Sequence, residues 1–157
     1  MVLSKQLKST LKFQQVEEVK AVPGQAGKGH TVKRMVGGPV TPTEQIEYIW
    51  NEYEPGVREP LHWHICEMAY YIVSGRAVLK DIKGKTYDLD PETLVYAPAG
   101  INGAHSFEAK TKLKMVELNA YADIEGPGVP WIIVDEKTKE STIELGSILK
   151  FGRTSLR

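Results

Sequence analysis

Residues 56–75 read GVREPLHWHICEMAYYIVSG and contain two of the four histidines of the chain, His62 and His64. Successive side chains of an extended strand point to opposite faces, so histidines two residues apart point the same way. Two imidazoles on one face can bind a single ion. The stretch therefore predicts half of a metal site, and the other ligands have to come from elsewhere in the chain.

The size and composition of the chain indicate one domain. At 157 residues, of which 41% are hydrophobic, the chain can bury a core without cross-links. Its 20 basic and 20 acidic side chains cancel, so we expect no attraction to nucleic acid. The single cysteine, Cys66, fits a reducing compartment, and no apolar run is typical of a membrane span or a signal peptide. We expect a cytoplasmic protein without a membrane partner.

From residue 45 onward, short β-forming runs are separated by turn residues about every ten positions, as in antiparallel sandwiches and barrels. We expect residues 1–44 to form an N-terminal arm and loop, 45–120 the barrel core, and 121–157 the C-terminal strands of the same domain. The arm is rich in glycine and proline and leaves room for one short strand near residues 31–36. We expect a strand that begins at the histidine pair. The other expected strands cover residues 46–50, 68–73, 77–82, 85–89, 94–97, 105–109, 113–118, 131–134 and 142–145.

Two motifs in this order resemble those of the cupin family. The first family motif is a glycine, five residues, His-x-His and a hairpin glycine, and the second is a Pro-x-Gly turn ahead of a third histidine. The resemblance implies an all-β fold, the cupin double-stranded β-helix or jelly-roll barrel, with a divalent metal inside. The matching residues are Gly56, His62, His64 and Gly75 in the first motif, and Pro98, Gly100 and His105 in the second.

The chain departs from the family pattern at two positions. The usual metal-binding glutamate falls at position 68, which is Met68 here, and alternation points the neighbouring Glu67 to the opposite face. Only a bulge or bend between residues 65 and 67 would turn that carboxylate inward. The usual third histidine falls at Gly103, whereas His105 comes two residues later. A shift of two keeps the face, and residues 101–104 can absorb the difference in length.

Three interpretations of the site follow from the resemblance. In the first, His62, His64 and His105 hold the metal alone, as in cupin dioxygenases that lack the glutamate. In the second, Glu67 bends inward as a fourth ligand. In the third, no metal binds and the histidines line a cavity. Imidazole ligands suit Fe(II), our leading choice, and also Zn, Ni, Mn or Cu.

The first interpretation predicts an Fe(II) dioxygenase that acts on a small chelating organic anion, because three neutral ligands leave the ion its full charge. Glu67 and Tyr70 are the candidates for proton transfer. The alternatives are a redox-neutral metal-dependent isomerase, decarboxylase or hydrolase, and a binding protein without catalysis. The resemblance also implies a homodimer formed by exchange of terminal strands, for which residues 11–22 are the candidate segment.

Overall fold

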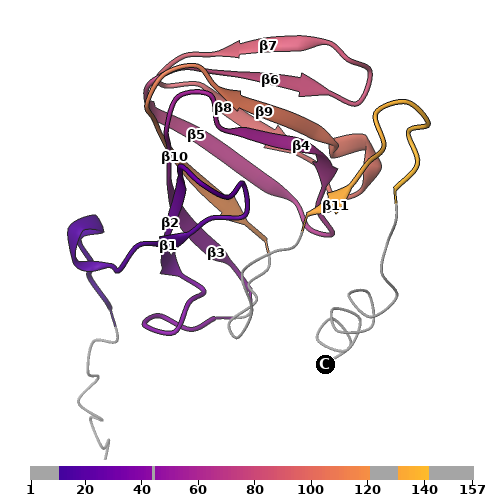
Figure 1. Ribbon diagram of the computed structural model, residues 1–157. Helices are drawn as coiled ribbons and strands as arrows, with labels where there is room; N and C mark the ends of the chain where they lie inside the picture. Colours follow the sequence, from indigo (N-terminus) through magenta and orange to yellow (C-terminus); the bar gives the residue numbers. More distant parts are fainter. Residues whose placement is uncertain (1–10, 44, 121–130, 142–157) are drawn as a thin grey trace, which may run out of the picture.

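The computed structural model describes residues 11–43, 45–120 and 131–141, which fold into two antiparallel sheets (Figure 1). The larger sheet has the strand order β1-β2-β3-β10-β5-β8, and the smaller one β11-β4-β9-β6-β7. This is the all-β jelly-roll architecture expected from the sequence. The strands are β1 (Val22–Pro23), β2 (His30–Val36), β3 (Glu47–Tyr53), β4 (Arg58–Trp63), β5 (Met68–Ser74), β6 (Ala77–Asp81), β7 (Thr86–Leu89), β8 (Leu94–Ala97), β9 (His105–Ala109), β10 (Leu113–Asn119) and β11 (Ile132–Ile133).

Most strands lie where the β-forming runs and turn residues predict them. Strands β8 and β9 have the expected bounds, and β2 is the short strand expected in the N-terminal segment. The expected strand at residues 142–145 lies outside the described residues. Short 3-10 helices precede β1 and β9, namely η1 (Val16–Glu18) and η2 (Ile101–Gly103).

The expectation that the histidine pair opens a strand was wrong. Strand β4 already begins at Arg58, and the pair stands at its end, with His64 just beyond the last strand residue, Trp63. The reason is the turn at Gly56, which adopts φ +84° and lets the chain return at once beside β9. The histidines therefore lie at the end of β4 that is farthest from this turn.

The hairpin glycine of the first motif has a steric reason. Gly75 adopts φ +85°, and a Cβ atom there would lie 2.1 Å from the carbonyl oxygen of Lys112. Any side chain would therefore push the β5–β6 turn away from the neighbouring chain segment.

The interior between the sheets is apolar toward one end and polar toward the other. The larger apolar cluster includes Ile72, Leu113 and Met115, and a second, smaller one contains Leu61, Ala104 and Val134. The polar part includes β3, where Glu47 and Asn51 are buried while the alternating Tyr48 is exposed. Within the described ranges, the structure has no helix long and apolar enough to cross a membrane.

Candidate metal centre

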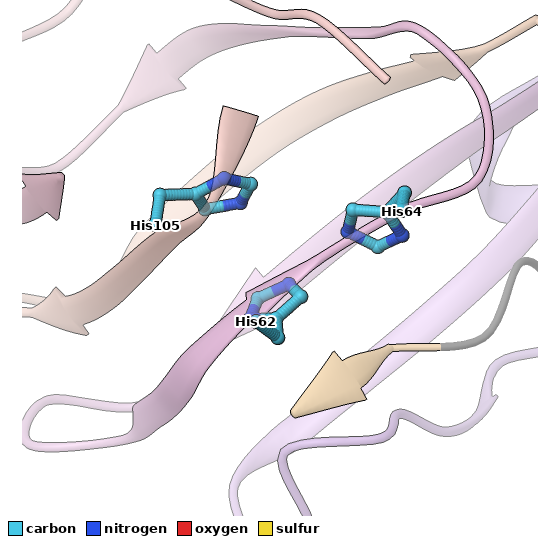
Figure 2. A group of neighbouring side chains, drawn as sticks. All are labelled: His62, His64 and His105. Atoms are coloured by element: carbon cyan, nitrogen blue, oxygen red, sulfur yellow. The ribbon is translucent and has the colours of Figure 1, made fainter. Parts of the chain in front are cut away.

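Three histidines converge in the interior: His62 on β4, His64 just after the end of β4, and His105 on β9 (Figure 2). His62 on β4 is the direct cross-strand partner of His105, the first residue of β9. The ring centroid of His62 lies 4.8 Å from that of His64 and 4.7 Å from that of His105. One nitrogen from each residue falls within 4.8 Å of the others, and all three side chains are buried. This group can hold one metal ion.

The two motifs meet through a backbone hydrogen bond. The amide of Gly100 donates to the carbonyl oxygen of His64 over 2.9 Å, which fixes the Pro-x-Gly turn against the histidine pair. Between this turn and β9, helix η2 takes up the two residues by which the chain exceeds the family spacing. His105 therefore stands at the start of β9, directly opposite His62.

Two of the histidines are held in the same tautomer. The Nδ1–H of His62 donates to the carbonyl oxygen of Pro60, and the Nδ1–H of His105 donates to that of Gly103, each over 2.7 Å. A carbonyl only accepts, so Nδ1 carries the proton and Nε2 keeps its lone pair. Burial lowers the pKa of both imidazoles, and for His62 the other two histidines lower it further. Both rings are therefore neutral, which is the form in which histidine binds a metal, and in both the Nε2 atom is the one without a proton.

The environment of Nε2 of His62 fits a metal rather than a hydrogen-bond network. The buried Nε2 of His62 has no hydrogen-bond partner among the described residues. A buried lone pair without a partner is costly, and a bound cation removes that cost. Beside the third ligand, the Tyr70 hydroxyl contacts Nε2 of His105. Tyr70 thus lies next to the group, as its assignment as a catalytic candidate requires.

Glu67, the other catalytic candidate, lies outside the histidine group. Its side chain is exposed, and Oε1 accepts a hydrogen bond from the Tyr96 hydroxyl over 2.8 Å. Met68 occupies the inward position instead, 3% exposed, with its sulfur 3.3 Å from the Tyr70 hydroxyl. The chain does bend at residues 65 and 66, between β4 and β5, but this bend leaves the Glu67 carboxylate on the outside.

The interior does contain a carboxyl group near the histidines, from a residue that the sequence did not indicate. Glu59 lies three positions before His62, so regular alternation would place it on the opposite face. However, the three steps from Glu59 to His62 on β4 match only two steps, from Phe107 to His105, on β9. The extra residue is a β-bulge, and it brings Glu59 and His62 to the same interior face. The signal in the sequence was Pro60, since proline inside a strand is typical of a bulge.

Glu59 belongs to a small polar cavity of about 30 Å³. A space of this size holds about one or two water molecules. The Tyr53 hydroxyl donates to Glu59 over 2.7 Å, and Glu117 on β10 lies on the same cavity wall. Trp131, which also lines the cavity, stacks on the His62 ring at 4.5 Å. Trp131 therefore lies against both the acid cavity and the histidine group.

The two cavity carboxyl groups hold their protons unusually tightly. Burial raises the pKa of Glu59 to about 8, and nearby Glu117 adds to the effect. Burial and the neighbouring Glu47 raise the pKa of Glu117 to about 7, against hydrogen bonds from Asn119 and Asn51 that lower it.

Burial also raises the pKa of Cys66 to about 12, so this thiol stays protonated and is a poor nucleophile.

We expect the melting temperature of the protein to fall as pH rises from 5 to 9, and less steeply in the Glu59→Gln variant. Unfolded chain releases the Glu59 proton near pH 4.5, whereas folded chain keeps it until about pH 8. Between these values the folded state binds more protons, so the free energy of unfolding decreases with pH. Between pH 5 and 9, the melting temperature of the unsubstituted chain should fall by at least about 3 °C more than that of the Glu59→Gln variant.

Glu54→Gln is the matched control for this measurement, because Glu54 is exposed and its only described ion pair, with Lys112, spans 3.4 Å at the surface. Its melting curve should follow that of the unsubstituted chain at every pH. If Glu59→Gln melts in parallel with the unsubstituted chain as well, Glu59 is not a buried protonated acid.

A larger cleft reaches the candidate centre from outside. It has a volume of about 450 Å³, and His105 forms part of its wall. Its floor is apolar, from Leu79, Leu89 and Ala97, while Asp81 and Asn102 supply polar groups. Volumes of this order are typical of sites for small organic molecules.

Comparison with known proteins supports the fold. A model of the cupin domain family matches residues 50–121, which contain all three histidines. A search of curated protein sequences gives no match.

Several solved structures share the architecture. The polyketide cyclase RemF from Streptomyces resistomycificus is 20% identical, covers 83% of this chain and 91% of its own, and superposes with a TM-score of 0.63. Oxalate decarboxylase from Bacillus subtilis is 20% identical over 73% of this chain and 30% of its own, with a TM-score of 0.57. Salicylate 1,2-dioxygenase from Pseudoaminobacter salicylatoxidans, in complex with gentisate, is 16% identical over 62% of this chain and 27% of its own, with a TM-score of 0.54.

Identities this low bear on the fold and leave the chemistry open. The three proteins differ in activity while sharing the two-sheet architecture described above. The family match, the jelly-roll topology and the two motifs agree with one another, and residues 50–121 of this chain form a cupin domain.

Proposed function

We propose that this chain is a metal-dependent enzyme whose ion is held by Nε2 of His62, Nε2 of His105 and an imidazole nitrogen of His64. The observation that carries the proposal is the preparation of the ligands: three buried histidines within reach of one ion, two of them fixed as the Nδ1–H tautomer. A divalent ion bound there supplies Lewis acidity and, if it is Fe(II), the capacity to react with O₂.

The leading form of the proposal is an Fe(II) dioxygenase acting on a small chelating organic anion. Three neutral ligands cancel none of the charge of a divalent ion, so an anionic substrate that chelates it is favoured electrostatically. The cleft beside His105 has room for a molecule of that size. A solved cupin of similar fold, salicylate 1,2-dioxygenase, binds gentisate, a small aromatic acid.

Within this proposal, Tyr70 is the hydrogen-bond donor to the substrate. Its hydroxyl lies beside Nε2 of His105, and burial raises its pKa well above the ordinary value, so it keeps its proton. A neutral phenol next to the ligands can orient an anionic substrate oxygen and stabilise charge on it. Glu67 takes no part, because its carboxylate faces outward toward Tyr96.

A second candidate is a redox-neutral enzyme of the isomerase, decarboxylase or cyclase type. The observation in its favour is Glu59, a buried acid with a pKa of about 8, close to the pH at which an acid–base catalyst works best. Two solved structures with this fold, RemF and oxalate decarboxylase, are named as a cyclase and a decarboxylase, and the latter contains Mn(II) centres.

The experiment that separates the two candidates combines metal analysis with oxygen consumption. The protein is purified without added metal, its metal content is measured, and a portion is loaded with Fe(II) under anaerobic conditions. We expect O₂ uptake with one or more chelating aromatic, keto or diketone acids, and none with the His62→Gln variant. Turnover without O₂ uptake would favour the redox-neutral candidate. Full iron occupancy with no turnover of any kind across the panel would contradict the enzyme proposal.

A further inference from the structure

An aspartate stands in the same cross-strand row of the smaller sheet as two of the proposed metal ligands. Strand β6 lies beside β9 (Figure 1), and Asp81 at its end is the direct cross-strand partner of His105. His105 is in turn the partner of His62 on β4. Directly paired residues of antiparallel strands point to the same face. Asp81 therefore points to the inner face of the sheet, on the side of His105 away from His62.

This position puts Asp81 in the wall of the cleft of about 450 Å³, which His105 also lines. Neighbouring strands of a sheet lie about 4.8 Å apart, so Asp81 stands one strand spacing beyond His105 and two beyond His62. The floor between them is apolar and includes Leu79 and Leu89. A small organic molecule that binds an ion at the histidines therefore points its far end toward Asp81.

The carboxylate of Asp81 keeps an accepting position for a ligand. Its Oδ1 accepts from the backbone amides of Lys83 and Lys85, each over 2.9 Å, and its Oδ2 accepts from the Tyr87 hydroxyl over 3.1 Å. A carboxylate offers about four lone-pair sites, so about one remains on Oδ2. Desolvation raises the pKa of Asp81, but these hydrogen bonds outweigh it and hold the pKa below its ordinary value. At neutral pH the group is a charged acceptor.

No lysine or arginine of the described residues lines the cleft to balance this charge. The charged side chains of its wall are Asp81 and Asp88, and both are acidic. The ammonium of Lys85 is directed to the Tyr87 ring, 4.8 Å from its centroid, and does not line the cleft. A ligand carboxylate at this end would meet repulsion, whereas a hydroxyl or an ammonium group would find an acceptor.

From these observations we propose that Asp81 selects the substrate by the end that does not bind the metal. The inference rests on the proposed function, which places the chelating end of an anionic substrate on the ion. The substrate then carries its one negative charge at that end, and at the other end a hydroxyl or amino group that donates to Oδ2 of Asp81. The substrate class is therefore hydroxylated or aminated monoacids, and diacids are rejected.

A hydrogen bond to a charged acceptor is worth about 10- to 100-fold in affinity, and repulsion between two carboxylates acts in the same direction. The test is ligand binding to the Co(II)-loaded chain, which needs no turnover. The visible absorption of Co(II) changes when a ligand coordinates the ion. The probes are benzohydroxamates, which chelate through one monoanionic head and carry an aminomethyl, hydroxyl or carboxylate group at the meta or para position.

We expect the aminomethyl and hydroxyl probes to bind at least about tenfold more tightly than the carboxylate probe. Asp81→Asn removes the charge, while its amide oxygen can still accept from the hairpin amides. In this variant the aminomethyl and carboxylate probes should bind to within about threefold of each other. Asp90→Asn is the matched control, because Asp90 is exposed in the turn after β7 and lies outside the wall of the cleft. It removes the same charge and should keep the preference.

A preference that the unsubstituted chain and Asp90→Asn share and that Asp81→Asn loses supports the proposal. Circular dichroism verifies folding, and the order of the probes on the unsubstituted chain decides the question if Asp81→Asn does not fold. A carboxylate probe that binds as tightly as the others, or a preference that Asp81→Asn keeps, overturns the role of Asp81 and leaves the proposed function standing. So does a Co(II)-loaded chain that binds none of the probes. A chain that binds no Co(II), or binds it equally well as His62→Gln, overturns the proposed function together with this inference.

Discussion

Replacing His62 with glutamine is expected to lower the affinity of the chain for a divalent metal by at least about 100-fold. Changes in the groups that merely orient a ligand typically cost 10–100-fold in affinity, so the loss of a ligand should cost more. His62 lies between the other two histidines, and its buried Nε2 has no hydrogen-bond partner among the described residues. Competition with a fluorescent chelator for Zn(II) or Co(II) measures the change without reference to any substrate.

His30→Gln is the control for this experiment. His30 is also a buried histidine, 4% exposed, but it stacks on Tyr53 and hydrogen-bonds to Asn51 rather than joining the group. Its variant should bind metal as tightly as the unsubstituted chain. Equal affinities for all three proteins would show that the three histidines do not form a metal site, and the proposed function would fail with it.

The strands of this fold could be predicted from the sequence because their signals are local. Alternation and turn residues determine where a strand begins and ends, and β8 and β9 have the expected bounds. It was harder to predict which face of each strand points into the interior. On β3 the buried side chains are Glu47 and Asn51, since the interior near them is a polar hydrogen-bonded network. Which face is interior depends on the whole barrel, and no single strand carries that information.

The candidate site divides in the same way. The convergence of His62, His64 and His105 could be anticipated, because spacing within a strand fixes a face and the family motifs order the strands. The buried acid near these histidines could not be anticipated from the sequence. The family pattern places the acid after the histidine pair, where Glu67 stands, but Glu67 faces outward. The inward-facing acid, Glu59, comes before the pair, where a bulge turns it inward. A bulge changes the parity of every residue beyond it, so counting along a strand fails wherever one occurs.

The second large effect is expected at Gly103, where the family pattern would have a histidine. A Cβ atom at this position would lie 1.9 Å from the carbonyl oxygen of Pro98, so no side chain fits while η2 keeps its shape. The carbonyl of Gly103 also holds the Nδ1–H of His105. Alanine should therefore displace the turn and, with it, the partner that orients the third ligand. We expect Gly103→Ala to weaken metal binding by 10–100-fold, in the range typical of lost orienting groups.

Gly100→Ala separates this effect from ordinary backbone strain. Gly100 begins the same turn and adopts φ +83°, but a Cβ atom there would meet nothing within 4 Å. Its alanine variant should lose about 1–2 kcal/mol of stability from the left-handed backbone and keep its metal affinity to within a few-fold. Chelator competition and thermal melts on both variants give the comparison. A folded Gly103→Ala protein that binds metal as well as Gly100→Ala would contradict this role for the turn, because His105 would then reach the ion without the support of the Gly103 carbonyl.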